Sequence, residues 1–478
     1  MNALLIILIG VATVLFCIIA LRLHAFLSLL LAALVTGLLT SQKQIYDFAL
    51  HSGMAEAAAQ SLSTQNVGAR LANGFGSTAG KIGILIALAS IIGTALMKSG
   101  GAERIVRSLL RLVGKERTDL ALIASSFTLG IPVFFDTVFY LLLPIVKSAS
   151  VRNPKKFSLY VMCAIAGGTM THSLVPPTPG PLFVAKELGV DMGLMMLGGI
   201  VVGAMTVTAG YIYARWANKK WALDIRDTPD ISIAELQEKL ETKEEDLPGF
   251  WLSLMPILLP IILITGNTFL EMVINPKDPS ASAFQQRLLE VFKILGDTNI
   301  ALLVSTSIAM YLLWHKTRNL KEFEKNVGES LTSAGMIILI TAAGGAFGQM
   351  LQQTDVGDKV GALAKGYQTA ILPLAFIITA LVRTAQGSAT VAMVTAIGVL
   401  SGIGGAKAFG FHPVYLALVI GCGSKIVPWM NDSAFWVITK MLGLETKETL
   451  RLFSLMLIVM GLTGLFVVMI LAYLFPLV

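Results

Sequence analysis

Long apolar runs separated by short charged loops dominate the chain from its first residues to its last. Ten of the runs are long enough to cross a bilayer as helices, some of them with the help of flanking residues. They cover residues 3–21, 25–40, 81–97, 157–175, 192–213, 250–270, 298–314, 331–351, 412–427 and 452–477. The pattern predicts an all-α polytopic membrane protein.

Two further apolar segments, 119–146 and 369–400, have polar or helix-breaking centres. Basic loops flank the first on both sides, so the positive-inside rule places both of its ends in the cytoplasm. A single span cannot do this but a re-entrant helical hairpin can, and one long kinked helix is the alternative. Loop 352–368 is poorer in positive charge, so segment 369–400 is predicted to be a second hairpin that enters from the outside.

Helix-breaking residues also interrupt two of the spans at equivalent places. Residues 171–181 read THSLVPPTPGP, and about 254 positions later residues 424–433 read SKIVPWMNDS. Unpaired backbone in hydrocarbon costs several kcal/mol per group, so such breaks survive where they line a wet cavity or a ligand site. We therefore predict discontinuous helices over 157–189 and 412–443.

These elements predict an inverted-topology repeat, in which each half has five spans, one of them discontinuous, and one re-entrant hairpin. The first repeat covers 1–215, a cytoplasmic linker covers 216–249, and the second repeat covers 250–478. Similar residues in 93–105 and 348–360, offset by about 255 positions, support this alignment. Loop charge places both termini in the periplasm. The mixed-charge linker is read as a solvated tether with a short helix near Ser232.

Composition narrows the classes of function. Hydrophobic residues make up 55% of the chain and charged residues only 14%, with a mean hydropathy of +0.76, which excludes an ordinary soluble enzyme. The net charge of +7 is spread over separate loops instead of one basic face, so it orients the protein in a membrane and does not indicate a nucleic-acid partner. The cysteines and histidines lack metal-ligand spacing, and we expect no metal and no cofactor.

The two hairpin tips and the two helix breaks are expected to meet near the middle of the bilayer. Half-helix ends present N–H groups and positive dipole ends that suit an anion, and a carboxylate substrate fits this arrangement. The candidate substrate-binding residues lie in these four elements: His172, Ser173, Thr178, Gly180, Arg383, Gly387, Ser388, Thr390, Ser424, Asn431, Asp432 and Ser433.

Ionisable residues inside spans are expensive, and each is a functional hypothesis. Arg383 presents a planar fork to a carboxylate, or it pairs structurally with Asp432 or Asp136. Asp136 is a candidate proton carrier or a member of an internal ion pair. His172 is a second proton-coupling candidate, or a neutral hydrogen-bonded pocket residue. Lys425 has no assigned role, because it can equally snorkel or pair with Asp432. The hydroxyl and amide side chains bind a polyol or cap freed backbone.

The sequence resembles the gluconate permease family of proton symporters, within the ion transporter superfamily. The resemblance covers nearly the whole chain and is carried by residues 171–181, 387–392 and 431–436. Asp136, Thr178 and Lys425 depart from the pattern common in that family. The resemblance implies a bacterial inner-membrane location, uptake of gluconate or related sugar acids and hydroxy acids with protons, and a homodimer with a mobile domain that contains both hairpins.

We therefore expect a secondary active transporter that takes up a sugar acid or hydroxycarboxylate with protons by an elevator-like alternating-access movement. The alternative is a sodium-coupled carboxylate transporter of the same architecture, with hard oxygen ligands from Ser173, Thr178, Asn431 and Ser433. A membrane-embedded enzyme would need a nucleophile with its base or a metal cluster, and the sequence offers neither. Hairpins that close from opposite faces fit alternating gates better than a passive channel.

Overall fold

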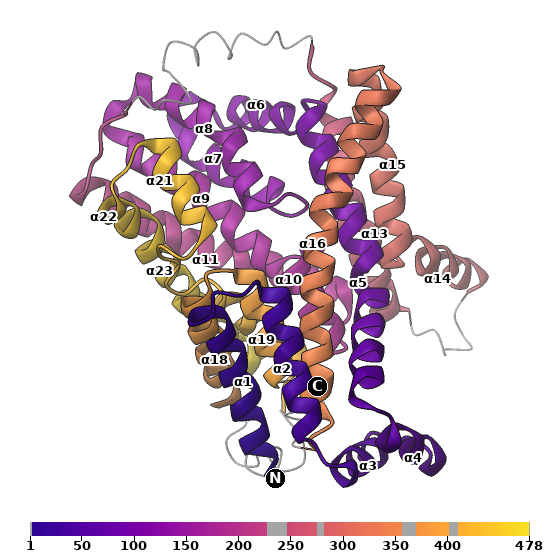
Figure 1. The fold of residues 1–478 in the computed structure, drawn as a ribbon. Coiled ribbons are helices and arrows are strands. Elements are labelled where there is room, and N and C mark those ends of the chain that lie inside the picture. The colour runs from indigo at the N-terminus through magenta and orange to yellow at the C-terminus, as the bar shows by residue number, and fades with distance from the viewer. Residues whose placement is uncertain (1, 227–245, 275–281, 356–369, 401–409, 478) are drawn as a thin grey trace.

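The computed structural model describes residues 2–226, 246–274, 282–355, 370–400 and 410–477. Within these ranges the chain is helical and contains no strand (Figure 1). Seven described segments are long and apolar enough to cross a membrane. An eighth is added if α2 (Ala25–Leu39) and α3 (Gln42–His51), which meet at a bend of 99°, count as one. The predicted all-α polytopic membrane fold is therefore confirmed.

The spanning helices agree with the predicted apolar runs, and most of them differ by several residues at one or both ends. α5 and α16 both begin well before the expected residues 81 and 331, because their first turns carry charged and amide side chains that lower the local hydropathy. The seven segments are α5 (Val67–Lys98), Pro154–Glu187, α11 (Met192–Lys220), α13 (Phe250–Val273), α15 (Thr298–Thr317), α16 (Leu320–Gln352) and Thr446–Leu474.

The remaining predicted spans form shorter helices. α1 (Ala3–Ile19) packs against α2, and α20 (Pro413–Gly423) is followed after a break by α21 (Ser433–Leu442). The segment Thr446–Leu474 contains α22 (Thr446–Thr449), a π-helical turn and α23 (Leu455–Leu474). Three further short helices, α4 (Glu56–Thr64), α6 (Gly101–Val113) and α14 (Ala283–Leu295), were not expected from the hydropathy pattern.

The two longest helices, α5 and α16, lie side by side along the molecule (Figure 1). Small residues at their interface make this close approach possible. A Cβ atom on Gly345 would overlap Thr78, and one on Gly74 would come within 3.2 Å of the Ala346 Cα atom. α2 packs on α16 and α15 packs on α5, which completes an upright group of helices at one side of the fold.

α9 (Phe157–Leu174) lies at the centre of the molecule, in contact with α7 (Thr118–Leu129), α8 (Phe135–Arg152) and α11. In the most apolar part of Pro154–Glu187, 94% of the residues are buried, the highest share among the seven spanning segments. The polar residues of α9 therefore face other protein elements and not lipid.

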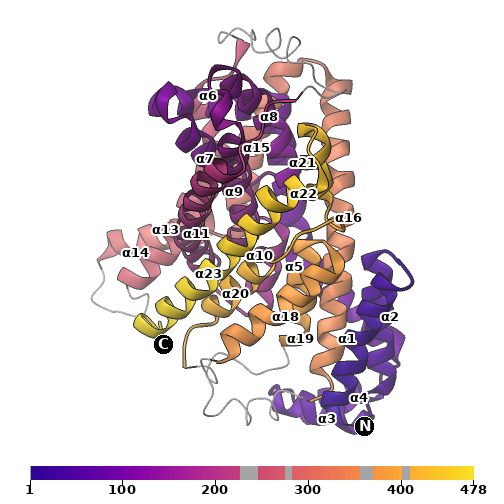
Figure 2. The same cartoon turned by 90° about the vertical axis from the view of Figure 1, so that its left-hand side faces the viewer.

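The two predicted hairpin segments each consist of two helices joined by a short turn. α7 and α8 form the first, and α18 (Ile371–Gln386) and α19 (Ala389–Leu400) form the second. The arms of each segment contact one another, which favours a hairpin over one kinked helix. The first pair lies in the upper half of the molecule and the second in the lower half (Figures 1 and 2). The second arm of the first hairpin continues past residue 146 to Arg152, and residue 369 lies outside the described ranges.

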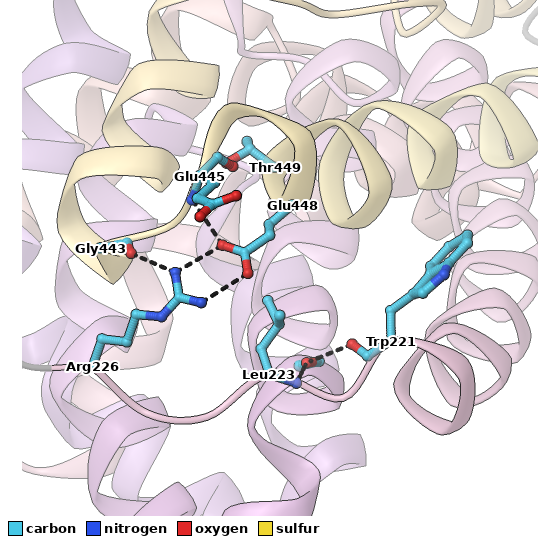
Figure 3. Close-up of polar contacts among 8 residues, drawn as sticks. Trp221, Leu223, Arg226, Gly443, Glu445, Glu448 and Thr449 are labelled. Carbon is cyan, nitrogen blue, oxygen red and sulfur yellow. Dashed lines mark hydrogen bonds and ion pairs between the residues drawn. The ribbon is translucent and has the colours of Figure 1, made fainter.

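The end of the first half is fixed to the second half. α11 continues to Lys220, past the expected boundary at 215, and residues 221–226 then run alongside the connection between α21 and α22 (Figure 3). Arg226 donates two hydrogen bonds of 2.8 Å to the Glu448 carboxylate and one of 2.9 Å to the carbonyl of Gly443. We name this contact between Arg226, Gly443 and Glu448 the linker clasp. The linker helix expected near Ser232 lies outside the described residues.

The linker clasp predicts a contribution to stability, because Arg226 donates two hydrogen bonds to the Glu448 carboxylate. We expect Glu448→Gln to cost about 0.5–1 kcal/mol at pH 7, since Arg226 is partly exposed and the pair is screened.

Thermal unfolding in detergent at pH 7 measures this difference between wild type and Glu448→Gln. Glu329→Gln is the matched control, because the Lys325–Glu329 pair is long at 4.0 Å and exposed. A Glu448→Gln protein that unfolds at the same temperature as the wild type would show that the linker clasp does not stabilise the fold.

Candidate functional site

Proline and small polar residues interrupt both discontinuous helices at the expected places. α9 ends at Leu174, and α10 (Pro179–Glu187) resumes after four residues that include two prolines. Proline lacks a backbone N–H and cannot continue the ladder of helical hydrogen bonds. The second break, between α20 and α21, is longer and covers residues 424–432. Both breaks leave helix ends and unpaired backbone groups inside the fold.

Side chains within the breaks satisfy several of these backbone groups. The hydroxyl of Thr178 donates to the carbonyl of Val175 at 2.7 Å, and that of Ser424 donates to the carbonyl of Gly421 at 2.7 Å. The Asp432 carboxylate accepts a hydrogen bond of 2.7 Å from the backbone N–H of Ala434 and so caps the start of α21. Capping of freed backbone is thus an observed role of Thr178, Ser424 and Asp432.

The tip of the second hairpin turns at Gly387, which has a φ of +86°. This left-handed conformation is readily adopted by glycine and strained for other residues. A Cβ atom at Gly387 would also overlap the backbone carbonyl of Asn431. The hairpin tip therefore touches the second helix break directly, through a contact that only a residue without a side chain permits.

Arg383, in the last turn of α18, joins the hairpin tip to the break. Its guanidinium donates to the carbonyl of Gly387 and forms an ion pair with Asp432. Both side chains are buried, with 3% of Arg383 and 4% of Asp432 exposed. The indole N–H of Trp429 and the side-chain amide of Asn431 each donate to the carbonyl of Thr384 at 2.8 Å. We name this set of contacts between α18 and residues 429–432 the hairpin tie.

A cavity of about 680 Å³ lies beside the hairpin tie, and the four predicted elements contribute to its wall together with His24, Phe453 and Leu457. The four elements are the first hairpin, the last turns of α9, the second hairpin tip and the second break with the start of α21. Nine of the predicted site residues line it: Asp136, His172, Arg383, Gly387, Ser388, Thr390, Asn431, Asp432 and Ser433. Asn431 and Ser433 are exposed and Arg383 is buried, so the polar wall extends from the surface into the interior.

Four predicted site residues do not line this cavity: Ser173, Thr178, Gly180 and Ser424. Thr178 and Ser424 cap backbone carbonyls, as described above. Gly180 packs against Met393 of the second hairpin, where a Cβ atom would come within 2.7 Å of the sulfur. Ser173 is buried where α9 meets α20, and its carbonyl lies against Gly421. These positions hold the broken helices in place and do not face the cavity.

Several lining residues were not predicted as part of the site: His24, Phe134, Phe135, Thr169, Gln386, Lys425, Phe453 and Leu457. Lys425 was recognised as an ionisable residue in a span but received no role. Gln386 lies in the recognised hairpin motif. The aromatic rings form contacts that sequence does not reveal, since Phe134 meets His172 edge-on at 5.7 Å and Phe135 stacks on Phe453 at 6.5 Å between ring centres.

The cavity wall carries side chains of both charges. Arg383 and Lys425 are the lining cations, and Asp136 and Asp432 are the lining carboxylates. Arg383 and Asp432 neutralise one another within the hairpin tie. Among the described residues, no group of three or more His, Cys, Asp and Glu side chains is placed to hold a metal ion. The arrangement is suited to binding a small polar molecule.

A polytopic helical fold that surrounds a polar cavity with helix breaks and hairpin tips defines the class of membrane transport proteins. The chain belongs to the GntP family of permeases, which matches residues 2–474. It is a multi-pass membrane permease and not an enzyme, and the resemblance to the gluconate permease family is confirmed.

Two relatives and one solved structure illustrate the similarity. A permease of Haemophilus influenzae is 32% identical over 94% of this chain and 87% of its own length. A gluconate permease of Pseudomonas aeruginosa is 32% identical over 84% of this chain and 86% of its own length. The YdaH transporter of Alcanivorax borkumensis shares the fold with a TM-score of 0.56, at 12% identity over 85% of this chain and 88% of that chain.

The contact between Gly387 and Asn431 predicts that Gly387→Ala disrupts the hairpin tie. The added methyl group must adopt a left-handed backbone and displace the break, which we expect to cost about 1–3 kcal/mol. The matched control is Gly335→Ala, because Gly335 lies within α16 with open space around its Cβ position. That control is expected to be neutral or stabilising by at most about 1 kcal/mol. Melting temperatures of the purified variants measure both effects, and equal stability of the two would contradict the close approach of tip and break.

Proposed function

We propose that this permease is a secondary active transporter that takes up gluconate or a related sugar acid or hydroxycarboxylate together with protons. The polar cavity between the hairpins and the helix breaks is the observation that carries the proposal. Its volume of about 680 Å³ lies within the range of roughly 300–1,000 Å³ that is usual for small-molecule sites. The name of the similar Pseudomonas aeruginosa protein, a gluconate permease, supports the substrate class.

The cavity wall offers groups for both parts of such a substrate. Cationic side chains suit its carboxylate. Ser388, Thr390, Asn431 and Ser433 line the same cavity and provide hydroxyl and amide groups for its hydroxyls. A sugar acid combines one carboxylate with several hydroxyl groups, so it uses both kinds of partner at once.

Asp136 is proposed as the proton carrier. It is half-buried in the first turn of α8, lines the cavity, and is subject to repulsion from the Asp432 carboxylate. An ionised Asp136 would repel an incoming anion, and protonation removes that charge. His172 is the second proposed proton-coupling residue, since it lines the cavity next to Phe134. One proton that moves with one monoanion transfers no net charge, so the proton gradient drives uptake and the membrane potential does not.

The proposed architecture is an inverted-topology repeat that works by alternating access. The element boundaries recur at a nearly constant offset in the two halves. α5 begins at residue 67 and α16 at 320, 253 positions later; α9 begins at 157 and α20 at 413, 256 positions later; α10 begins at 179 and α21 at 433, 254 positions later. Hairpins in opposite halves of the molecule also agree with opposite orientation.

The proposed movement is that of an elevator, in which both hairpins and both broken helices move together against the remaining helices. The hairpin tie supports this grouping, because it fixes the second hairpin to the second broken helix. We further propose a bacterial inner-membrane location with a cytoplasmic linker, both termini in the periplasm, and a homodimer. The distribution of basic loops supports the orientation.

Uptake by the purified protein in proteoliposomes tests the proposed function. An inward proton gradient is expected to drive accumulation of radiolabelled gluconate above equilibrium, and a membrane potential alone is not. Saturation of the initial rate distinguishes a carrier from a channel. Accumulation that needs an inward sodium gradient and ignores the proton gradient would replace proton coupling by the sodium-coupled alternative.

The same assay with Asp136→Asn tests the proton carrier. The variant is expected to lose accumulation driven by the proton gradient and to retain exchange of internal for external substrate. Asparagine has nearly the same size as aspartate, so the substitution removes only the titratable carboxyl group. Unchanged accumulation in Asp136→Asn would remove Asp136 from proton coupling and leave the transporter assignment in place.

A further inference from the structure

The two cations that line the cavity, Arg383 and Lys425, differ in their partners within the protein. Arg383 donates to the carbonyl of Gly387, and its charge is paired with the Asp432 carboxylate, although its Nε–H has no hydrogen-bond partner among the described residues. Lys425 lies in the first residues of the second break and is only 4% exposed. Within the described part of the chain, its ammonium group has neither an ion-pair partner nor a hydrogen-bond acceptor.

A buried ammonium group without a partner is costly, and such groups in proteins are normally paired. In a membrane-spanning region this cost is highest, and an ionisable residue there is a candidate for a functional role. Lys425 lines the cavity, so an anion in the cavity can reach it. Asp432, the carboxylate nearest to Lys425 in the sequence, is already bound by Arg383.

We propose that Lys425 is the residue that binds the carboxylate of the transported anion, and that Arg383 is a positioning residue that holds the hairpin tip. This inference rests on the proposed function and deepens it. It assigns the charge recognition of the substrate to the second helix break instead of the second hairpin.

Two further buried atoms indicate what accompanies the carboxylate. The side-chain oxygen of Gln386 and the Nδ1 atom of His172 both lack a hydrogen-bond partner among the described residues, and both side chains line the cavity. An unsatisfied buried polar atom costs roughly 1–3 kcal/mol, which a bound ligand removes. The Gln386 oxygen accepts a hydrogen bond, and hydroxyl groups donate. The ligand class is therefore a carboxylate that carries hydroxyl groups.

The proposed role of Lys425 gives an expected ratio of protons to anions. The titratable and charged groups of the wall are His24, Asp136, His172, Arg383, Lys425 and Asp432. Besides the Arg383–Asp432 pair, a protonated Lys425 and an ionised Asp136 would balance one another in the empty cavity. A bound monoanion gives a net negative charge unless Asp136 takes up a proton. One proton per carboxylate restores neutrality.

Binding measurements on the purified, full-length protein by titration calorimetry test the role of Lys425. The probes are gluconate and gluconamide, which has the same hydroxyl groups and no charge. The wild type is expected to prefer gluconate. Lys425→Met is expected to weaken gluconate binding by at least roughly tenfold and to leave gluconamide binding unchanged. Lys425→Arg, which keeps the charge, is expected to retain the preference for gluconate.

Lys440→Met is the matched control, because Lys440 is an exposed lysine of α21. It is expected to bind both probes like the wild type. The melting temperature of substrate-free protein adds a second readout, since removal of an unpaired buried charge should leave Lys425→Met at least as stable as the wild type. Lys425→Gln provides a second neutral variant with the same expected loss of gluconate binding.

Three results would overturn the inference. Gluconate affinity in Lys425→Met or Lys425→Gln equal to that of the wild type would remove Lys425 from substrate binding and leave the proposed function intact. A strongly lowered melting temperature in both neutral variants would show that Lys425 is a structural residue. A wild-type protein that binds neither gluconate nor any other hydroxycarboxylate tested would contradict the inference and the proposed function together.

Discussion

The contacts of Arg383 with Gly387 and Asp432, which form the centre of the hairpin tie, are the interaction on which the rest of the site depends. A hairpin tip and a helix break are both places where backbone groups have lost their helical partners. Arg383 binds one carbonyl of the tip and the carboxylate that caps α21, so a single guanidinium group fixes both ends at once. Because Arg has several donors in a rigid plane, it can make these contacts in different directions. The cavity lies beside this contact, and both elements line it.

The surrounding helices provide the frame that makes such irregular backbone tolerable in a membrane. Non-helical backbone survives at membrane depth only where protein or water surrounds it. α9 is almost completely buried, and the pair of long helices α5 and α16 packs closely through small residues. The polar side chains of the breaks are therefore shielded from lipid. In this setting the proposed roles follow from the pairing state of each charge: the paired Arg383 holds the hairpin tip, and the unpaired Lys425 binds the ligand.

Sequence reasoning found the helix breaks and the hairpins because proline, glycine and charged residues are rare inside apolar runs, and each has a physical cost there. It predicted a hairpin over 369–400 and a helix break over 424–433, and the structure turns at Gly387 and interrupts the helix over 424–432. It could not decide which way a hydroxyl group points, so Ser173, Thr178 and Ser424 were expected in the cavity although two of them cap backbone carbonyls and Ser173 is buried against α20. Likewise Lys425 was recognised without a role, because only the three-dimensional contacts reveal that Asp432 belongs to Arg383. His24 comes from the distant α1–α2 connection, and no local pattern links it to the site.

The most direct measurement is an experimental map of the protein in lipid nanodiscs with gluconate bound. We predict density for the ligand in the cavity, with its carboxylate at Lys425, its hydroxyl groups near Gln386 and His172, and the Arg383–Asp432 pair intact. Ligand density outside the cavity, or a carboxylate bound to Arg383 with Asp432 displaced, would contradict the account.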